Sequence, residues 1–290
     1  MAALTVILYL SSIYIPFFGF LLSFLCPIPV MFLVIRWDLK TGLLAAGVAS
    51  LVVFAFAGIL QALVCLLGFS FLGVIMGLAI KRGLEWLEVI AWGTMISLLS
   101  KVALMGLALL LIGENPVAQS IAIMEDVLNQ NSKFLGDVGE EGVKMLIQVI
   151  RLSLPGILIV ASLFDTVLNF ILGSWVGKKI DILFPEIPPF SLWRLPRSVA
   201  WVFILGWILV IFGGVTFWGQ VGLNVQIVTQ TLFLVQGASV IYFFLDKRIA
   251  SQILKVIIVL FLAIQPLFST LIAWVGVFDT WFDFRKTKGT

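Results

Sequence analysis

Long apolar runs, separated by short polar groups, occupy nearly the whole chain. A transmembrane helix needs about 20 predominantly apolar residues, and most of the runs approach or exceed that length. The apolar part of PIPVMFLVIRWDLK (27–40) has only about ten residues, so we expect a short, tilted or re-entrant helix there. The pattern predicts an all-α, polytopic helical membrane protein with about 8–10 transmembrane or re-entrant helices. The other expected spans are 1–26, 41–63, 66–80, 86–112, 155–177, 199–218, 225–245 and a final run broken by Pro266.

One sizeable polar segment, residues 113–147, interrupts this pattern. Asn115 can cap a helix, and Pro116 suits the first helical position. The segment carries six acidic residues against two basic ones, so it is acidic. We predict a pair of amphipathic helices that lie on the membrane surface. The apolar residues that recur at helical spacing are Val117, Ile121, Met124 and Leu128.

A proline-rich connector, residues 178–198, follows the span 155–177 and contains LFPEIPPFSLWRLPR. Basic residues are concentrated in this connector and in short groups at 36–40, 81–82 and 247–255. Cytoplasmic loops keep an excess of Lys and Arg, so we place these groups in the cytoplasm and the acidic segment on the opposite side. Apolar runs leave no room for a separate catalytic domain, so we expect residues 1–290 to form a single integral membrane domain.

The basic residues at the C-terminus decide between two arrangements of the last apolar run. A single final span would leave Arg285, Lys286 and Lys288 on the outer side. A hairpin of two short helices that turns near Pro266 would bring them to the cytoplasmic side. We predict the hairpin, on the charge rule alone.

Composition supports the membrane assignment and argues against several kinds of catalytic and cofactor-binding site. Apolar residues make up 62% of the chain and charged residues 11%, with a mean hydropathy of +1.19. There is no histidine, and the only cysteines are Cys26 and Cys65, so zinc sites, haem ligation and histidine-based triads are excluded or nearly so. GSWVGKK (173–179) lacks the spacing of a phosphate-binding loop. We expect no cofactor, no metal, no nucleic-acid partner and no enzymatic activity.

Two charged residues lie near the middle of predicted spans: Lys101 in 86–112 and Asp165 in 155–177. A single charge at the bilayer centre costs at least about 2.5–3.5 kcal/mol, so we expect the two to pair. Helical spacing adds Asn169 to the face of Asp165. Two interpretations stay open. The residues line a polar cavity or proton-linked site, or they form a buried pair that fixes the register of two helices.

Uncharged polar residues gather in NVQIVTQTLFLVQGASV (224–240). They are too many for a surface that faces lipid, so we expect this helix to line a protein interior. Hydrogen bonds between helices, at roughly 0.6 kcal/mol each, explain them without a ligand, and a ligand-lining wall is the alternative. The residues are Asn224, Gln226, Thr229, Gln230 and Gln236.

Small residues recur at every fourth position in three stretches. Such faces allow helices to approach closely, and we expect packing within the chain in preference to a dimer interface. The stretches are Gly42, Ala46 and Ser50, then Gly73 and Gly77, then Gly173 and Gly177.

Six segments carry a family resemblance: IYIPFFG, PIPVMFLVIRWDLKTG, LPGILIVASLFDTVLNF, PPFSLWRLPRSVAW, LFLVQGASVIYFFLDK and GVFDTWFDFRK. Together they resemble the bacterial membrane proteins called YybS-like, a family of unknown function. The resemblance covers nearly the whole length and implies a multi-pass protein of the bacterial cytoplasmic (inner) membrane. That family is distantly similar to the substrate-binding S-components of energy-coupling-factor vitamin transporters, here through PIPVMFLVIRWDLKTGLLAAG. This chain differs from those S-components in having more spans.

These observations favour a small-solute-binding or transport-associated membrane protein that is S-component-like. The alternative is a non-transporting assembly or scaffold protein that binds other membrane or envelope proteins through its small-residue faces and acidic helices. The expected partners are therefore the lipid bilayer, a small-molecule ligand and membrane proteins. The residues expected to line the polar pocket are Lys101, Asp165, Asn169, Gln226, Gln230 and Gln236.

An enzyme that acts on lipid is a more distant possibility. It would need several ionisable groups converging at the level of the lipid headgroups. Asp279 and Asp283 beside Arg285 are one such group. We expect them to be a solvated helix end.

Overall fold

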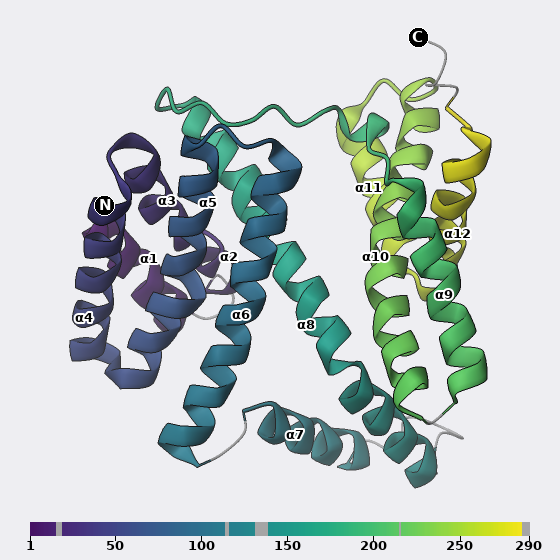
Figure 1. Cartoon of the computed structure of the whole chain (residues 1–290), viewed down its shortest axis with the longest axis horizontal. Coiled ribbons are helices and arrows are strands. Elements are labelled where there is room, and N and C mark those ends of the chain that lie inside the picture. The colour runs from purple at the N-terminus through teal and green to yellow at the C-terminus, as the bar shows by residue number, and fades with distance from the viewer. Residues whose placement is uncertain (16–18, 114–115, 131–138, 215, 286–290) are drawn as a thin grey trace. The chain divides into compact units, whose positions relative to one another are not determined.

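The computed structural model describes residues 1–15, 19–113, 116–130, 139–214 and 216–285 (Figure 1). Within these residues every regular element is a helix, which confirms the all-α prediction. Four helical stretches are long and apolar enough to cross a membrane, or five if one bent pair counts as a single span. The helices are α1 (Ala2–Tyr14), α2 (Gly19–Ser23), α3 (Pro27–Arg36), α4 (Leu39–Leu63), the π-helix η1 (Val64–Ser70), α5 (Phe71–Lys81), α6 (Trp86–Ile112), α7 (Pro116–Gln130), α8 (Gly139–Lys178), the 3-10 helix η4 (Phe190–Leu192), α9 (Arg197–Gly213), α10 (Phe217–Asp246), α11 (Gln252–Ile264) and α12 (Pro266–Phe282).

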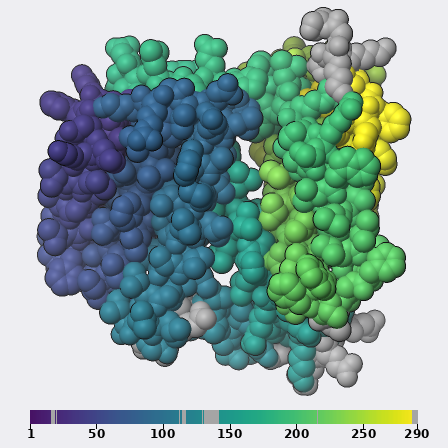
Figure 2. All heavy atoms as spheres, viewed as in Figure 1, coloured from purple at the N-terminus to yellow at the C-terminus, as the bar shows by residue number. Residues whose placement is uncertain are grey.

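The chain divides into two compact units, and α8 contributes to both. Unit 1 consists of Met1–Ile147 and Ala161–Glu186, and unit 2 of Gln148–Val160 and Ile187–Thr290. Side chains fill the spaces between the ribbons inside each unit (Figure 2).

In unit 1, α3 and α5 pack closely against each other. Pro27 begins α3, at a position where a missing amide hydrogen costs no helical hydrogen bond. A Cβ atom added at Gly73 would lie 2.3 Å from the carbonyl oxygen of Pro27, and one at Gly77 would lie 2.7 Å from that of Met31. Only glycine permits this approach, so the predicted packing of this small-residue face within the chain is confirmed.

The two spans predicted at 41–63 and 66–80 differ from the structure in where they are divided. Helical structure continues from Leu39 to Lys81, through the π-helical turns of η1. The backbone departs from helical geometry at Gly58, whose φ is 85° and ψ 176°. The chain changes direction there, because glycine tolerates positive φ without a steric penalty. The predicted boundary was thus wrong by several residues.

Asp38 caps the first turn of α4. Its Oδ1 accepts a hydrogen bond from the backbone nitrogen of Thr41 at 2.7 Å. Hydrogen bonds from the Thr41 side chain and backbone hold the pKa of the Asp38 carboxyl below its ordinary value. A carboxyl group whose pKa falls on folding adds stability above its unfolded pKa, about 3.9, and loses it as the pH falls through the folded pKa.

We therefore expect the wild-type protein to lose stability on acidification relative to Asp38→Asn, which keeps a capping oxygen but does not titrate. Thermal unfolding of both proteins, measured from neutral pH to below about pH 4, checks this. A stability difference that stays constant over the whole pH range would contradict the assignment.

Unit 2 is built around α10, which packs on α9 and α12 (Figure 1). Aromatic side chains fill the contact, with the rings of Phe203 and Phe233 5.4 Å apart and nearly perpendicular. Small residues allow α12 to approach closely. The buried residues of this core are Ala200, Phe203, Phe233, Ala273 and Val277.

The turn between α9 and α10 comes earlier than predicted. We expected it around residues 219–224, where two glycines and an asparagine occur. α9 instead ends at Gly213, Gly214 adopts a positive φ of 53°, and α10 begins at Phe217. Gly219 and Gly222 belong to α10; Gly222 packs on Leu209 and Val210 of α9, and Gly219 packs against the turn at Gly213 and Gly214.

The final apolar run bends at the predicted place. α11 and α12 meet at Gln265 and Pro266 with a bend of 106°. Proline begins α12 and cannot continue the hydrogen bonding of α11, which accounts for the break. The structure thus contains two short helices near Pro266, as the hairpin prediction requires.

The predicted surface segment 113–147 includes α7 and the first turns of α8. Ile121 of α7 is buried, and most neighbouring positions are exposed, as an amphipathic helix requires. The predicted cap Asn115 lies outside the described residues. The connector 178–198 is mainly extended and contains η4.

Candidate functional site

The predicted pairing of Lys101 and Asp165 is present in unit 1. Lys101 belongs to α6 and Asp165 to α8, and Nζ lies 2.5 Å from Oδ2. Ser97 joins them, since its hydroxyl accepts from Lys101 at 2.7 Å and donates to Asp165 at 3.4 Å. The two charged side chains are 28% and 31% exposed. The pair is therefore neutralised but not sealed inside the protein.

Close packing of α6 against α8 holds this pair in register. A Cβ atom added at Gly93 would lie 2.4 Å from Cγ2 of Thr166. Thr166 itself is fully buried and donates its hydroxyl to the carbonyl of Ser162 at 2.8 Å. Thr166 directly follows Asp165, so this contact places Asp165 beside α6, where the side chain of Lys101 reaches it.

Three buried polar atoms on the two helices that carry the pair have no hydrogen-bond partner among the described residues. They are the hydroxyl oxygens of Ser162 and Thr94 and Oδ1 of Asn169. The amide nitrogen of Asn169 donates to the carbonyl of Asp165 at 2.9 Å, so only its acceptor is free. Ser162, Asp165 and Asn169 share one helix face. An unsatisfied buried polar group costs about 1–3 kcal/mol, so this face holds unused hydrogen-bonding capacity.

The three candidate glutamines of α10 lie in unit 2 and have different surroundings. Gln226 is buried, and both atoms of its amide lack partners in the described part of the chain. Gln230 is half-buried. Gln236 is 1% exposed and fully engaged in a network of hydrogen bonds. The six predicted residues therefore divide three and three between the two units.

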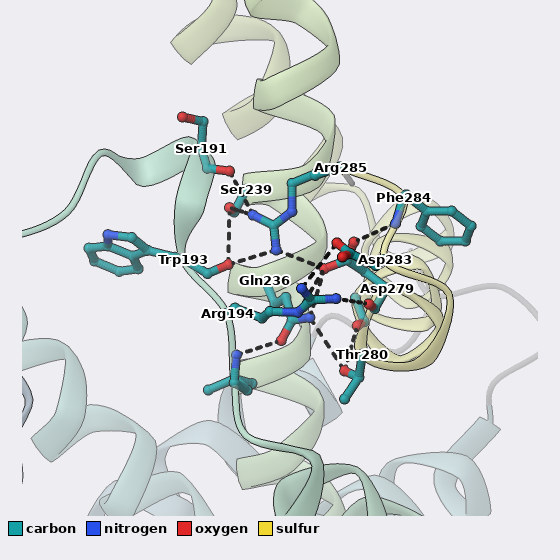
Figure 3. Close-up of polar contacts among 12 residues, drawn as sticks. Ser191, Trp193, Arg194, Gln236, Ser239, Asp279, Thr280, Asp283, Phe284 and Arg285 are labelled. Atoms are coloured by element: carbon teal, nitrogen blue, oxygen red, sulfur yellow. Dashed lines mark hydrogen bonds and ion pairs between the residues drawn. The ribbon is translucent and has the colours of Figure 1, made fainter. Parts of the chain in front are cut away.

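A buried ionic cluster surrounds Gln236, in the C-terminal half of α10 and at the end of α12 (Figure 3). Its centre is Asp279, which is 0% exposed. Asp279 Oδ2 accepts from Arg285 Nη2 at 2.7 Å and from Gln236 Nε2 at 3.1 Å. Asp279 Oδ1 accepts from the backbone nitrogen of Phe284 at 3.1 Å. Both carboxylate oxygens are thus satisfied, as a buried charge requires.

Two arginines connect this cluster to the extended connector. Arg285 donates to the carbonyls of Ser191 at 2.6 Å and Trp193 at 3.0 Å. Arg194 donates to the carbonyl of Asp279 at 2.7 Å and to Oδ1 of Asp283 at 3.0 Å. The arrangement joins the connector, α10 and the end of α12 through charged groups (Figure 3). The cluster therefore has the contacts of a structural element that holds these three segments together.

The expectation that these residues form a solvated helix end was wrong. Asp279 and Arg285 are buried because the connector covers them with its backbone carbonyls. The sequence did hold a signal, since Asp279 and Asp283 stand one helical turn apart and share a face near an arginine. Spacing alone does not show which distant loop covers that face.

Residues 3–280 match the family model described as Predicted membrane protein (DUF2232). A similar protein is "Uncharacterized protein YybS" of Bacillus subtilis (strain 168), which is 25% identical and aligned over 98% of this chain and 94% of its own length. No solved structure matches. The predicted resemblance to YybS-like proteins is confirmed, and the more distant similarity to transporter S-components stays a prediction.

Proposed function

Because the chain belongs to the family described as Predicted membrane protein (DUF2232), we propose that it is a multi-pass protein of the bacterial cytoplasmic membrane that binds a small polar solute. In this proposal the solute binds at Lys101 and Asp165, and the protein has a transport-associated role. The observation that carries it is the combination of a partly exposed ion pair with buried polar atoms that lack partners.

If the ion pair were purely structural, we would expect the buried polar groups on the same helices to have hydrogen-bond partners. Here Ser162, Thr94 and Asn169 each keep an unused donor or acceptor on the helices that carry the charges. A bound solute that supplies the missing groups would remove this cost. The site offers one cation, one anion and neutral hydrogen-bonding groups, so a small zwitterion is the ligand class that fits best. Intramembrane sites of this kind occur near the bilayer centre in transporters.

The test compares the wild-type protein with the double variant Lys101→Met/Asp165→Leu. Both are purified in mild detergent, and the small molecules released on denaturation are identified by mass spectrometry. We expect the wild type to carry a small polar solute and the double variant to lose it while keeping its thermal stability. Removing both charges together leaves no unpaired charge behind, so the fold is preserved.

Asp246→Leu/Lys255→Met is the matched control. It removes another ion pair, between the end of α10 and α11, and the bound solute should remain. The proposal fails if wild type and double variant carry the same molecules, or if the wild type carries none. A stable protein partner without bound solute would instead support the scaffold alternative.

One argument for the scaffold alternative is weakened. It relied partly on small-residue faces being free for other proteins. Gly73 and Gly77 pack on α3, and Gly173 and Gly177 contact side chains of Met31 and Phe184 inside unit 1. These faces are therefore used within the chain, and we favour solute binding.

A further inference from the structure

A cavity of about 530 Å³ lies in unit 2, against α8, α9 and α10. This volume falls within the roughly 300–1,000 Å³ of small-molecule sites in proteins. Its wall is mainly aliphatic and includes Ile159, Val202, Val221 and Val228. An apolar wall between apolar helices, two of which are long enough to cross a membrane, favours an occupant that partitions into the bilayer.

Asn224 holds the α8 side of the cavity in place. Its Oδ1 accepts from the backbone nitrogen of Gly156 at 2.6 Å, and its Nδ2 donates to the carbonyl of Leu152 at 2.9 Å. In an uninterrupted helix these two backbone groups bond to each other. The side chain therefore inserts at the turn next to Pro155, where a helix is already weakened. Two hydrogen bonds thus fix the α8 wall of the cavity to α10.

Arg151 lines the same cavity and is exposed. No side chain or carbonyl of the described residues pairs with its guanidinium. Gln220 also lines this part of the cavity, in the first turn of α10. From Arg151 to Ile159 the α8 wall extends for about 12 Å, at 1.5 Å per residue. The cavity is therefore amphipathic, with a cation at one end and aliphatic residues along its length.

We propose that this cavity binds one acyl chain of an anionic phospholipid, whose phosphate is held by Arg151. The planar guanidinium is suited to bidentate hydrogen bonds with phosphate oxygens. Arg151 lies near the level of Phe217, where α10 begins, and the ends of spanning helices are where lipid headgroups are found. A zwitterionic lipid carries its own cation beside the phosphate, so it gains less from the arginine. The proposal does not depend on solute binding at Lys101 and Asp165, which lie in unit 1.

Native mass spectrometry of the purified full-length protein tests this site. Phosphatidylglycerol and phosphatidylcholine with the same acyl chains are added in equal amounts, and the bound fractions are compared. We expect the wild type to prefer phosphatidylglycerol by about tenfold, which corresponds to a difference of about 1.4 kcal/mol in binding free energy. Arg151→Gln should abolish that preference, because it should lower phosphatidylglycerol binding about tenfold more than phosphatidylcholine binding.

Two further variants separate the headgroup from the chain. Val228→Phe places extra atoms in the cavity and should reduce the binding of both lipids. Arg248→Gln removes an exposed arginine beyond the opposite end of α10 and should retain the preference. The proposal is overturned if Arg151→Gln and Arg248→Gln behave alike, or if Val228→Phe binds both lipids as the wild type does.

Discussion

Replacing Asp279 by alanine is expected to lower the free energy of unfolding by about 3–5 kcal/mol, the cost of removing one partner from a buried ion pair. Asp279 is 0% exposed and accepts from both Arg285 and Gln236. Its loss leaves the Arg285 guanidinium, whose side chain is 1% exposed, without its anionic partner. The connector and α12 should separate first, because this cluster joins them.

A second substitution distinguishes loss of the charge pair from simple loss of packing. Arg285→Met in the Asp279→Ala background removes the stranded cation, so much of the lost stability should return. Thermal unfolding of the four proteins of this cycle gives the interaction energy. Asp246→Asn serves as a control, because that carboxylate is 55% exposed and should matter little. If Asp279→Ala is as mild as the control, the cluster does not stabilise the fold.

The sequence predicted the helical class and one long-range contact correctly, for the same physical reason. Uninterrupted apolar runs can satisfy their backbone in lipid only as helices. Lys101 and Asp165 each faced a high cost alone near the middle of a span, so pairing was the expected solution, and their side chains do meet. Where the alternatives to a structure cost a large free energy, the sequence is sufficient to predict that structure. Whether that pair also binds a solute depends on smaller energies and stays a prediction.

The features that the sequence did not predict depend on backbone geometry and on distant loops. Gly58 interrupts a long helical run. The sequence did not predict this break, because the run is equally apolar on both sides of Gly58. Gly222 suggested a turn, whereas it lies inside α10 and contacts Leu209 and Val210 of α9. Asp279 is buried by the carbonyls of Ser191 and Trp193, which residue types do not reveal. The sequence also did not predict that Gln236 donates to Asp279 inside this cluster.

The contact between α10 and α12 leads to a second large effect. A Cβ atom added at Gly237 would lie 1.8 Å from the carbonyl oxygen of Ile272, and one at Gly276 would lie 2.3 Å from that of Phe233. Both obstacles are backbone atoms, which cannot rotate away as a side chain can. We expect Gly237→Ala to destabilise the protein by about 3 kcal/mol, the upper end of typical overpacking costs.

The sign of this effect separates close helix contact from ordinary helix propensity. Alanine normally stabilises a helix relative to glycine by about 0.5–1 kcal/mol. Gly106 of α6 has nothing within 4 Å of an added Cβ, so Gly106→Ala should raise the unfolding temperature while Gly237→Ala lowers it. Gly237 also follows Gln236, so moving α12 away should weaken the bond between Gln236 and Asp279. The loss from Gly237→Ala should therefore be smaller in the Asp279→Ala background. Equal losses in both backgrounds would mean that the helix crossing and the ionic cluster stabilise unit 2 independently.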